Sequence, residues 1–223
     1  MRPSDLALEH GISTQAVRNY ERDGFLPPAV RTESGYRVYT EEHAAALRAF
    51  LALVPAHGHA AAGRIMNAVH DGDLDGALEI IDRGHEQLLR DRETLAAAGS
   101  VVQRPPADDL TVGELARRLR VTPATVRKWE DAGILAPGRD PATGYRRFRA
   151  ADVRDAELAH LLRRGGYPLG RIAEIVRRIR EAGEIDSLDD WRERLTTRGV
   201  AMLDAAARLS DYLGPARPRS PGR

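Results

Sequence analysis

The chain has 223 residues, of which 42% are hydrophobic and 30% are charged, and its formal net charge at pH 7 is +1. These values are ordinary for a soluble globular protein with one large or two modest domains. No stretch approaches the roughly 20 apolar residues of a membrane-spanning helix, and the N-terminus lacks a signal peptide's apolar core, so we expect a cytoplasmic protein with no membrane partner. The absence of cysteine excludes disulfides and sulfur-ligated zinc, and we expect no cofactor and no metal.

The N-terminal segment predicts a helix-turn-helix followed by a β-hairpin. Ser4 can cap a short first helix, residues 10–11 make a turn, and Ser13 can cap a second helix that Gly24 ends. The segment Ser34–Tyr39 then has a glycine at its tip and alternates aromatic residues with arginine. This pattern is typical of a small hairpin, or wing.

A helical stretch follows the first wing and ends in a long amphipathic helix. Helices resume at residues 40–42, and Pro55 with Gly58 predicts a break. Near residues 74–98, seam positions recur at alternating spacings of four and three, and such a seam requires a partner helix. The positions are Leu74, Leu78, Ile81, His85, Leu88, Arg92 and Leu95. The polar members, His85 and Arg92, set the register of a helix pair or line a pocket for a small effector.

Two motifs near this helix carry alternative interpretations. Residues 71–82 satisfy the spacing of an EF-hand calcium loop, but Asp82 stands where a longer glutamate is expected, and Asp73 or Asp75 also serves as a helix cap. The segment 57–59, His-Gly-His, lacks the further ligands that a metal site needs, which favours a plain loop.

The second half of the chain repeats the signals of the first. Residues 100–109 contain adjacent prolines and no apolar periodicity, which predicts a linker. Beyond the linker come a capping box at Thr111 and Glu114, a cap at Thr122 followed by Pro123, a stop at Gly133 and a second wing at Thr143–Phe148. We therefore expect a second helix-turn-helix with its own wing.

The C-terminal part predicts further helices and a second seam. A helix starts near Ala150, residues 165–168 predict a break, and a long helix covers 188–213 with Ser187 and Asp190 at its start. Its seam is interrupted by Arg198 and consists of Leu188, Trp191, Leu195, Met202, Ala205, Leu209 and Tyr212. We expect domains at 1–99 and 110–213, with a disordered tail at 214–223.

Residues 5–39 recur at 114–148 without a gap. Eleven positions are identical 109 residues later, namely Leu6, Ala7, Val17, Arg18, Glu21, Gly24, Leu26, Pro28, Gly35, Tyr36 and Arg37. The copies differ in charge: residues 3–48 hold five arginines against seven acids, whereas residues 110–154 hold ten basic residues against five acids. A duplicated helix-turn-helix suits a DNA duplex with two half-sites, and the second copy carries most of the attraction to phosphate.

The segments Thr14–Glu21 and Pro123–Glu130, each followed by a glycine and later by Gly-Tyr-Arg, resemble the DNA-binding domain of the MerR family. The resemblance covers both repeats and is specific as a compound pattern, because its parts occur twice in the same order. It implies a mainly α fold of tandem winged helix-turn-helix domains with small β-hairpin wings and long helices of the coiled-coil type. In that family the long helix forms an antiparallel coiled coil between two subunits, and two copies allow both partners to lie in one chain.

The resemblance also implies DNA-contacting residues. Arg18 and Arg127 match the recognition-helix arginine, and Tyr36, Arg37, Tyr145 and Arg146 match wing residues that hold the DNA backbone. From the residues themselves, an arginine fork suits guanine or two phosphate oxygens, and Asn19 or Gln15 can pair with adenine. The predicted set is completed by Thr14, Tyr20, Thr125, Lys128, Trp129 and Arg147. Tyr20 and Trp129 either pack beneath the wing or contact the DNA backbone.

We expect a transcription regulator that reads an imperfect palindromic promoter element with two non-identical modules and distorts that DNA. RNA polymerase on the promoter and a small-molecule effector stay open as further partners. One chain acting as a pseudo-dimer is favoured over a homodimer.

The alternatives to regulation are a small-molecule-binding, sequestering protein on the same scaffold and a DNA-independent partner-binding module, and the acidic first copy supports both. No nucleophile elbow, phosphate-binding loop or pair of catalytic carboxylates is recognisable, so we expect no catalytic residues and no enzyme.

Overall fold

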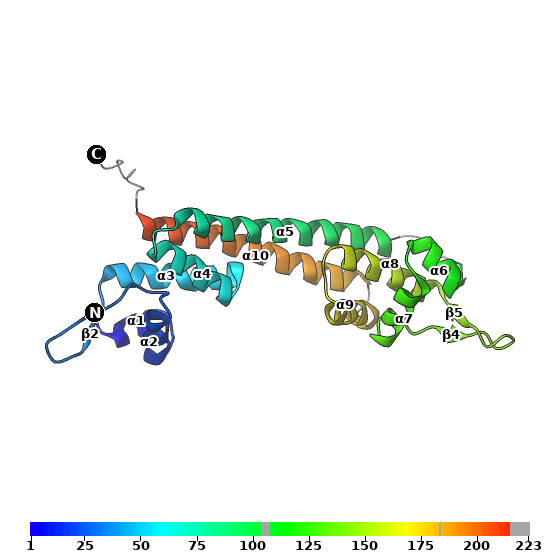
Figure 1. Ribbon diagram of the computed structural model, residues 1–223, viewed down its shortest axis with the longest axis horizontal. Coiled ribbons are helices and arrows are strands. Elements are labelled where there is room, and N and C mark those ends of the chain that lie inside the picture. Colours follow the sequence, from blue (N-terminus) through cyan, green and yellow to red (C-terminus); the bar gives the residue numbers. More distant parts are fainter. Residues whose placement is uncertain (104–107, 183, 215–223) are drawn as a thin grey trace. The chain divides into compact units, whose positions relative to one another are not determined.

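The computed structural model describes residues 1–103, 108–182 and 184–214, apart from the side chains of residues 182 and 184–187. The chain is mainly α-helical with small antiparallel hairpins, which confirms the expected fold class (Figure 1). It divides into two compact units, the first made of Met1–Leu88 and the segment from Thr196, the second of Leu89–Leu195. Among the described residues, no helix has the length and apolar character needed to cross a bilayer.

The first unit contains the first winged module. Its elements are α1 (Pro3–Glu9), α2 (Thr14–Arg22), β1 (Val30–Arg31), β2 (Arg37–Val38), α3 (Glu41–His57), α4 (His59–His70), the first half of α5 (Leu74–Val102) and the last half of α10 (Glu184–Leu213). Strands β1 and β2 pair antiparallel, with Val30 opposite Val38. The helix-turn-helix and the wing are therefore both present as predicted.

The second unit contains the second winged module. Its elements are the last half of α5, β3 (Leu110–Thr111), α6 (Val112–Leu119), α7 (Pro123–Asp131), β4 (Gly138–Arg139), β5 (Arg146–Phe148), α8 (Ala150–Arg164), α9 (Leu169–Ala182) and the first half of α10. The sheet order is β3-β5-β4. Strand β3 was not predicted, because its two residues acquire strand geometry only by pairing with β5, more than thirty residues later.

Each long helix contributes one half to each unit, so the compact units and the sequence repeats do not coincide. The division into domains 1–99 and 110–213 stays a prediction about the repeats. Helix α5 extends to Val102 and takes residues 100–102 from the expected linker. Residues 104–107 of that linker and 215–223 of the tail lie outside the described residues.

Most helix starts follow the predicted caps. The Ser13 hydroxyl accepts a hydrogen bond from the Ala16 amide at 3.0 Å, and Thr111 with Glu114 forms the expected reciprocal capping box. Ser4, however, is not a cap. Helix α1 begins at Pro3, two residues before the start that a Ser4 cap implies, and the Asp5 carboxylate accepts from the Arg2 amide at 2.8 Å.

Two other helix boundaries differ from the sequence prediction. Helix α3 continues through Pro55 to His57 and is broken at Gly58, whose φ of 85° ends the helix. Helix α10 begins at Glu184, before the predicted cap at Ser187, whose side chain lies outside the described residues. The break predicted between α8 and α9 is confirmed, with Gly166 at a φ of 87°.

The seam predicted for α10 is confirmed. Leu188, Leu195, Met202, Ala205 and Leu209 are buried, and Trp191 and Tyr212 are half-buried. Arg198, which interrupts the seam, donates from Nε to the carbonyl oxygen of Ala56 at 3.0 Å. The arginine thereby ties α10 to the end of α3.

The seam predicted for α5 is half correct. Leu88 and Leu95 are buried, but Leu74 and Leu78 are 41% and 45% exposed, and His85 and Arg92 are also exposed. The inward positions one residue earlier are small: Ala77 is buried, and a Cβ at Gly84 would lie 2.4 Å from His57 Nδ1 and 3.4 Å from Met202 Cε. Small residues let neighbouring helices approach closely. A prediction based on the spacing of large apolar residues does not identify such positions.

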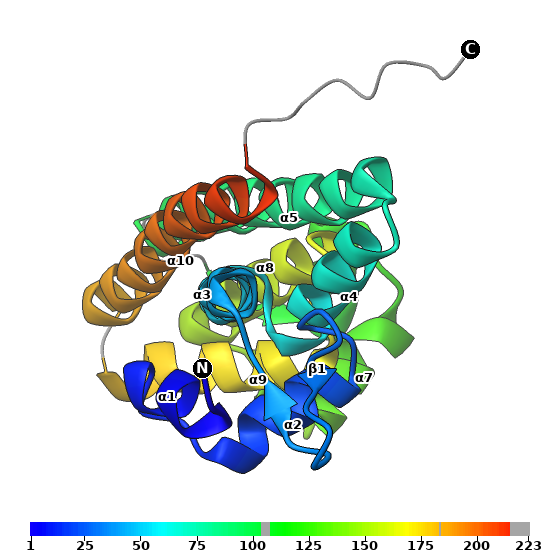
Figure 2. The same ribbon diagram turned by 90° about the vertical axis from the view of Figure 1, so that its left-hand side faces the viewer.

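Within the first unit, the first half of α5 and the last half of α10 run side by side in opposite directions (Figure 1, Figure 2). Met202 packs near Gly84, and the Tyr212 hydroxyl lies 2.8 Å from His70 Nε2, just before α5 begins. Burial raises the pKa of Tyr212 to about 12, so this hydroxyl keeps its proton and can donate to the imidazole.

The second unit shows the complementary pairing, through Tyr167. This residue follows α8, and its hydroxyl donates to Asp91 of α5 at 2.7 Å while its ring contacts Trp191 of α10 at 6.1 Å between centroids. In both units, therefore, a long-helix segment from one repeat packs with a long-helix segment from the other repeat.

The calcium-loop interpretation of residues 71–82 is wrong. Residues 74–82 are helical, whereas an EF-hand ligand loop is not, and Asp73 Oδ1 caps α5 by accepting from the Gly76 amide at 2.9 Å. At 57–59 a helix end, one glycine and a helix start replace the expected loop. Within the described residues, no group of three His, Asp or Glu side chains converges as a metal site would require.

The two modules differ at one position with a strained backbone, in the turn between their first two helices. The turn between the first two helices uses a left-handed residue in both modules, Gly11 with φ 62° and Arg120 with φ 52°. An L-residue pays about 1–2 kcal/mol for this conformation, and glycine's greater chain entropy offsets about half of that gain. We expect Arg120→Gly to raise the free energy of unfolding by about 0.5–1 kcal/mol, measured by denaturant titration.

The matched control is Arg120→Ala, which removes the same guanidinium but keeps the Cβ. It should give no increase in the free energy of unfolding. An equal increase in both variants would show that the charge, rather than the backbone, is responsible.

Candidate nucleic-acid interface

Helix α2 is fixed to the first module by its apolar face. Val17 is fully buried and packs in the same core as Leu6 and Leu26, so the opposite face of the helix points to solvent. Thr14, Gln15 and Arg18 are exposed on that face. Arg18 forms no hydrogen bond or ion pair with any residue that the structure describes, so its whole guanidinium is available to a ligand.

Three polar side chains of α2 are linked by hydrogen bonds. Gln15 Nε2 donates to Asn19 Oδ1 at 3.0 Å, and Arg22 Nη1 donates to the same oxygen at 3.2 Å. These are exposed contacts that a base edge can replace. The first module therefore presents one free arginine beside amide groups, the side chains that pair with adenine.

Glu21 connects the first wing to α2. Its Oε2 accepts from Arg37 Nε at 2.6 Å and from the Tyr39 hydroxyl at 2.8 Å. Burial and the Glu21 carboxylate raise the pKa of Tyr39, so its hydroxyl stays protonated and keeps donating. Because Glu21 engages only Nε, the Nη groups of Arg37 remain free to donate to phosphate, and Tyr36 at the wing tip is 74% exposed.

A groove of about 840 Å³ gathers these residues on one surface. Arg2, Arg18 and Arg37 line it together with Thr14 and Tyr36. Three arginines facing one groove provide an attractive potential for a phosphate backbone, despite the acidic balance of the first repeat.

Helix α7 presents a more basic surface in the second module. Val126 is fully buried, while Arg127 and Lys128 are exposed and have no hydrogen bond or ion pair among the described residues. Thr125 is half-buried and its hydroxyl lies 3.1 Å from that of the cap Thr122, so it belongs partly to the helix start. Two adjacent free cations favour phosphate over base edges.

The second wing repeats the brace of the first. Arg146 Nε lies 3.0 and 2.9 Å from the two carboxylate oxygens of Glu130, and Tyr145 at the tip is 75% exposed. Arg147 is engaged twice, by Asp109 at 2.8 Å and by Asp140 at 3.4 Å. These contacts help to fix the wing, and because the Arg147 side chain is 53% exposed, its contact with DNA stays a prediction.

The two ambiguous aromatic residues differ in burial: Trp129 belongs to the core, and Tyr20 is half-buried. Trp129 is 2% exposed, so its ring has no surface to offer DNA, and the prediction that it contacts the backbone is withdrawn. Tyr20 is half-buried, with its ring centroid 4.7 Å from that of Phe50. The ring contacts place Tyr20 against α3 and α4 and Trp129 against His160 of α8, so packing rather than DNA contact accounts for Trp129, and packing beneath the wing stays a prediction.

In each module a later helix supports the loop after the recognition helix: His70 Nδ1 of α4 lies 2.8 Å from the Gly24 carbonyl oxygen in the first, and Arg180 of α9 supports the loop in the second. Arg180 of α9 donates from Nε to Asp155 at 2.7 Å and from Nη2 to the Ile134 carbonyl at 2.6 Å. Burial raises the pKa of Asp155 despite this arginine. The contact fixes the loop after α7, and sequence reasoning missed it because the partners lie 46 residues apart.

An ion pair joins the first and third helices of each module, with its charges exchanged. In the first module Arg48 Nε lies 2.6 Å from Glu9, and in the second Arg118 Nε lies 2.8 Å from Glu157. Positions 9 and 118 are equivalent in the repeat, as are 48 and 157. The Arg48 hydrogen bond also lowers the pKa of Glu9. Comparing the two copies position by position could have revealed this pair.

Comparisons with known proteins match both modules. Residues 2–39 match a family described as MerR family regulatory protein, and residues 110–179 match one described as MerR HTH family regulatory protein. No solved structure gives a significant match.

Similar curated proteins include the HTH-type transcriptional regulator CueR of Salmonella typhi, 44% identical over 43 residues that make up 19% of this chain and 31% of that protein. CueR of Escherichia coli O157:H7 is also 44% identical over 43 residues, 19% of this chain and 32% of the relative. A probable heavy metal-dependent transcriptional regulator of Haemophilus influenzae is 49% identical over 41 residues, 18% of this chain and 32% of the relative. The match thus spans about a third of each relative's length.

The exchanged ion pair can be tested by charge reversal. Arg118→Glu places a second carboxylate beside Glu157, whose side chain is only 11% exposed, and should lower the free energy of unfolding by about 1 kcal/mol. Adding Glu157→Arg rebuilds the polarity of Glu9 and Arg48 and should recover most of that loss. The measurement is a double-mutant cycle by denaturant unfolding, with an expected coupling of about 0.5–1 kcal/mol.

Arg117→Glu, at the exposed neighbouring position, serves as the control for the added negative charge. If the double variant is no more stable than Arg118→Glu alone, the pair does not hold α6 to α8.

Proposed function

Because the chain belongs to the MerR family of transcriptional regulators and carries two MerR-type helix-turn-helix modules, we propose that it binds double-stranded DNA with both modules and regulates transcription. The observation that carries the proposal is the repeated pairing of a free arginine with an exposed wing. Arg18 and Arg127 occupy the same position on two recognition helices, and each module adds an exposed wing tyrosine, Tyr36 or Tyr145.

The chemistry of these residues supports a division between reading bases and holding phosphates. An arginine on the exposed face of a recognition helix donates a bidentate pair to guanine or to two phosphate oxygens. The wings supply the Nη groups of Arg37 and Arg146, already oriented by glutamates, for the backbone on either side. Orientation before binding reduces the entropy lost when the complex forms.

The two modules differ enough to predict an imperfect palindrome. The first module offers Gln15 and Asn19 beside Arg18, whereas the second offers Lys128 beside Arg127. We propose that the first module reads hydrogen-bonding edges and that the second anchors the protein by charge.

The pairing of the long helices supports a single-chain pseudo-dimer. Each unit already combines an α5 segment with an α10 segment of the same chain, and the α10 seam is buried without a second copy. We propose that binding by both modules deforms the DNA at a cost of about 1–6 kcal/mol, and that the distorted promoter is the state that RNA polymerase engages.

The runner-up function is a sequestering protein that binds a small molecule on the same scaffold. A cleft in the second unit, lined by α5, α6 and α8, supports it. Heavy-metal dependence is a property that one relative's name states for that relative. This chain has no cysteine and, in its described part, no cluster of metal-ligating side chains, so we do not extend metal dependence to it. We likewise propose no catalytic activity.

The roles of the two arginines can be separated by DNA binding. DNA fragments selected from a random pool with the full chain supply the binding site. We expect Arg127→Ala to weaken binding to all sequences by about 10- to 100-fold and to reduce the slope of log K against log salt by about one. Arg18→Ala should lose affinity mainly for the selected site and relax its specificity.

Arg83→Ala is the matched control, because Arg83 is an exposed arginine of α5 that is paired with Glu79 outside both modules. It should bind DNA like the unaltered chain. A selected site that is perfectly symmetric, with equal losses from Arg18→Ala and Arg127→Ala, would contradict the asymmetric assignment; no loss from either would overturn DNA binding itself.

The single-chain arrangement predicts a stoichiometry. Sedimentation of the protein with its selected DNA fragment should give one chain per fragment, independent of protein concentration above saturation. Two chains per fragment would show that a homodimer is the DNA-binding form.

A further inference from the structure

Each unit has a cleft where the module meets a long helix, and the two clefts are equivalent in the repeat. The first-unit cleft, of about 430 Å³, lies among α1, α3 and α10, and the second-unit cleft, of about 610 Å³, lies among α5, α6 and α8. The exchanged ion pair, Glu9 with Arg48 or Arg118 with Glu157, lines both. The duplication thus supplies an internal comparison for the larger cleft.

The second cleft differs from the first in what surrounds this ion pair. Where the first has Leu51 and Pro55 on α3, the second has His160 and Arg164 on α8. Where the first has His10 and Ala52, the second has Leu119 and Leu161. The second cleft therefore combines a basic corner with a larger apolar lining.

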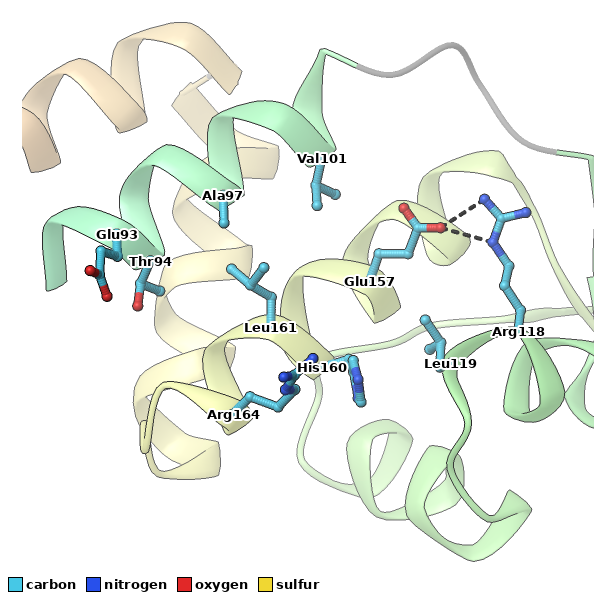
Figure 3. Close-up of a pocket in the computed structure, with 10 residues that line it drawn as sticks. All are labelled: Glu93, Thr94, Ala97, Val101, Arg118, Leu119, Glu157, His160, Leu161 and Arg164. Atoms are coloured by element: carbon cyan, nitrogen blue, oxygen red, sulfur yellow. Dashed lines mark hydrogen bonds and ion pairs between the residues drawn. The ribbon is translucent and has the colours of Figure 1, made fainter. Parts of the chain in front are cut away.

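We propose that the second-unit cleft binds a small amphipathic organic anion, with its carboxylate at Arg164 and His160 and its apolar body against Leu119, Leu161 and Val101. The two basic side chains stand one turn apart on α8 and lie close together in Figure 3. Neither makes a hydrogen bond or ion pair with another described residue. A carboxylate would supply the missing partner for both.

The other charges of the cleft leave this corner positive. Arg118 and Glu157 neutralise each other at 2.8 Å, as the dashed lines in Figure 3 show. Glu93 lies on α5 at the edge of the cleft, and in Figure 3 its carboxylate is well separated from Arg164. An anion at Arg164 thus meets an uncompensated cation, while its apolar part would cover the half-buried side chains of Leu161 and Ala97 beside the buried Leu119 and Val101.

His160 connects binding to pH. Burial, and secondarily the neighbouring Arg164, lowers the pKa of His160, so the imidazole is neutral at pH 7 in the free protein. The groups that face it are Arg164 and Glu157 on α8, Arg118 on α6, Glu93 on α5, and the Trp129 ring of α7 at 6.5 Å between centroids. A bound carboxylate favours the imidazolium and raises this pKa, so affinity should increase as pH falls from about 8 to about 6.

A ligand in this cleft would touch a long helix and the winged module at once, through Ala97 and Val101 on α5, Leu119 on α6, and α8. The approach of α8 to α5 is close at one end, where a Cβ at Gly165 would lie 3.0 Å from Thr94 Oγ1. Filling the open part would bias how the module sits against α5. The inference that the anion is an effector rests on the proposed function, whereas its binding does not.

The test uses the full chain and two probes, octanoate and 2-naphthoate, measured by isothermal titration calorimetry without DNA. At least one probe should bind, whereas octanol and octylamine should bind at least tenfold more weakly because they lack the carboxylate. Arg164→Gln should weaken binding of the carboxylate probe at least tenfold. Arg208→Gln, which removes an arginine from the equivalent first-unit cleft, should leave binding unchanged.

His160→Gln should remove the increase in affinity between pH about 8 and about 6 while leaving the thermal stability near that of the unaltered chain. The proposal is overturned if neither probe binds, or if Arg164→Gln and Arg208→Gln weaken binding equally. Failure of the regulator function would look different: carboxylate binding would persist in a chain that binds no DNA.

Discussion

The packing of a long helix of one repeat against a long helix of the other is the constraint on which both units depend. Leu188, Leu195, Met202 and Leu209 are each at least 93% buried along α10. Burying a large aliphatic side chain stabilises a fold by about 1.5–3 kcal/mol, so this seam contributes an amount comparable to the whole net stability of a domain. Each unit therefore includes buried residues of a long helix from the other repeat.

This dependence explains what the sequence could predict and what it could not. Local signals were sufficient for the recognition helices and wings, because the Ser13 cap, the Thr111 capping box and the Gly-Tyr-Arg turns act within a few residues of themselves. On the inner face of α5, the sequence predicted Leu78 and His85, whereas the residues one position earlier, Ala77 and Gly84, face inward. The small side chains of these two residues allow neighbouring helices to pack closely, and a search for large apolar residues does not detect them.

The candidate site divides in the same way. Helical periodicity and the repeat were enough to place Arg18 and Arg127 on exposed faces and Val17 and Val126 in the core. They could not show that Trp129 on α7 is buried while Tyr145 on the wing is exposed, because both are aromatic residues near basic side chains and only tertiary packing distinguishes them. Nor could they show that glutamates from the recognition helices hold the wing arginines.

Differences between the two repeats distinguish residues that stabilise a module from residues that can give one module a separate function. The ion pair between the first and third helices exchanges its charges between copies, so attraction is required there but its direction is not. The Glu21–Arg37 and Glu130–Arg146 braces keep their direction, which agrees with the proposal that the wing arginines contact phosphate. Where the copies diverge, at His160 and Arg164, His160 contacts the Trp129 ring, but neither residue has a hydrogen-bond or ion-pair partner among the described residues. Unbalanced charge beside an apolar lining is what a ligand, rather than the fold, would explain.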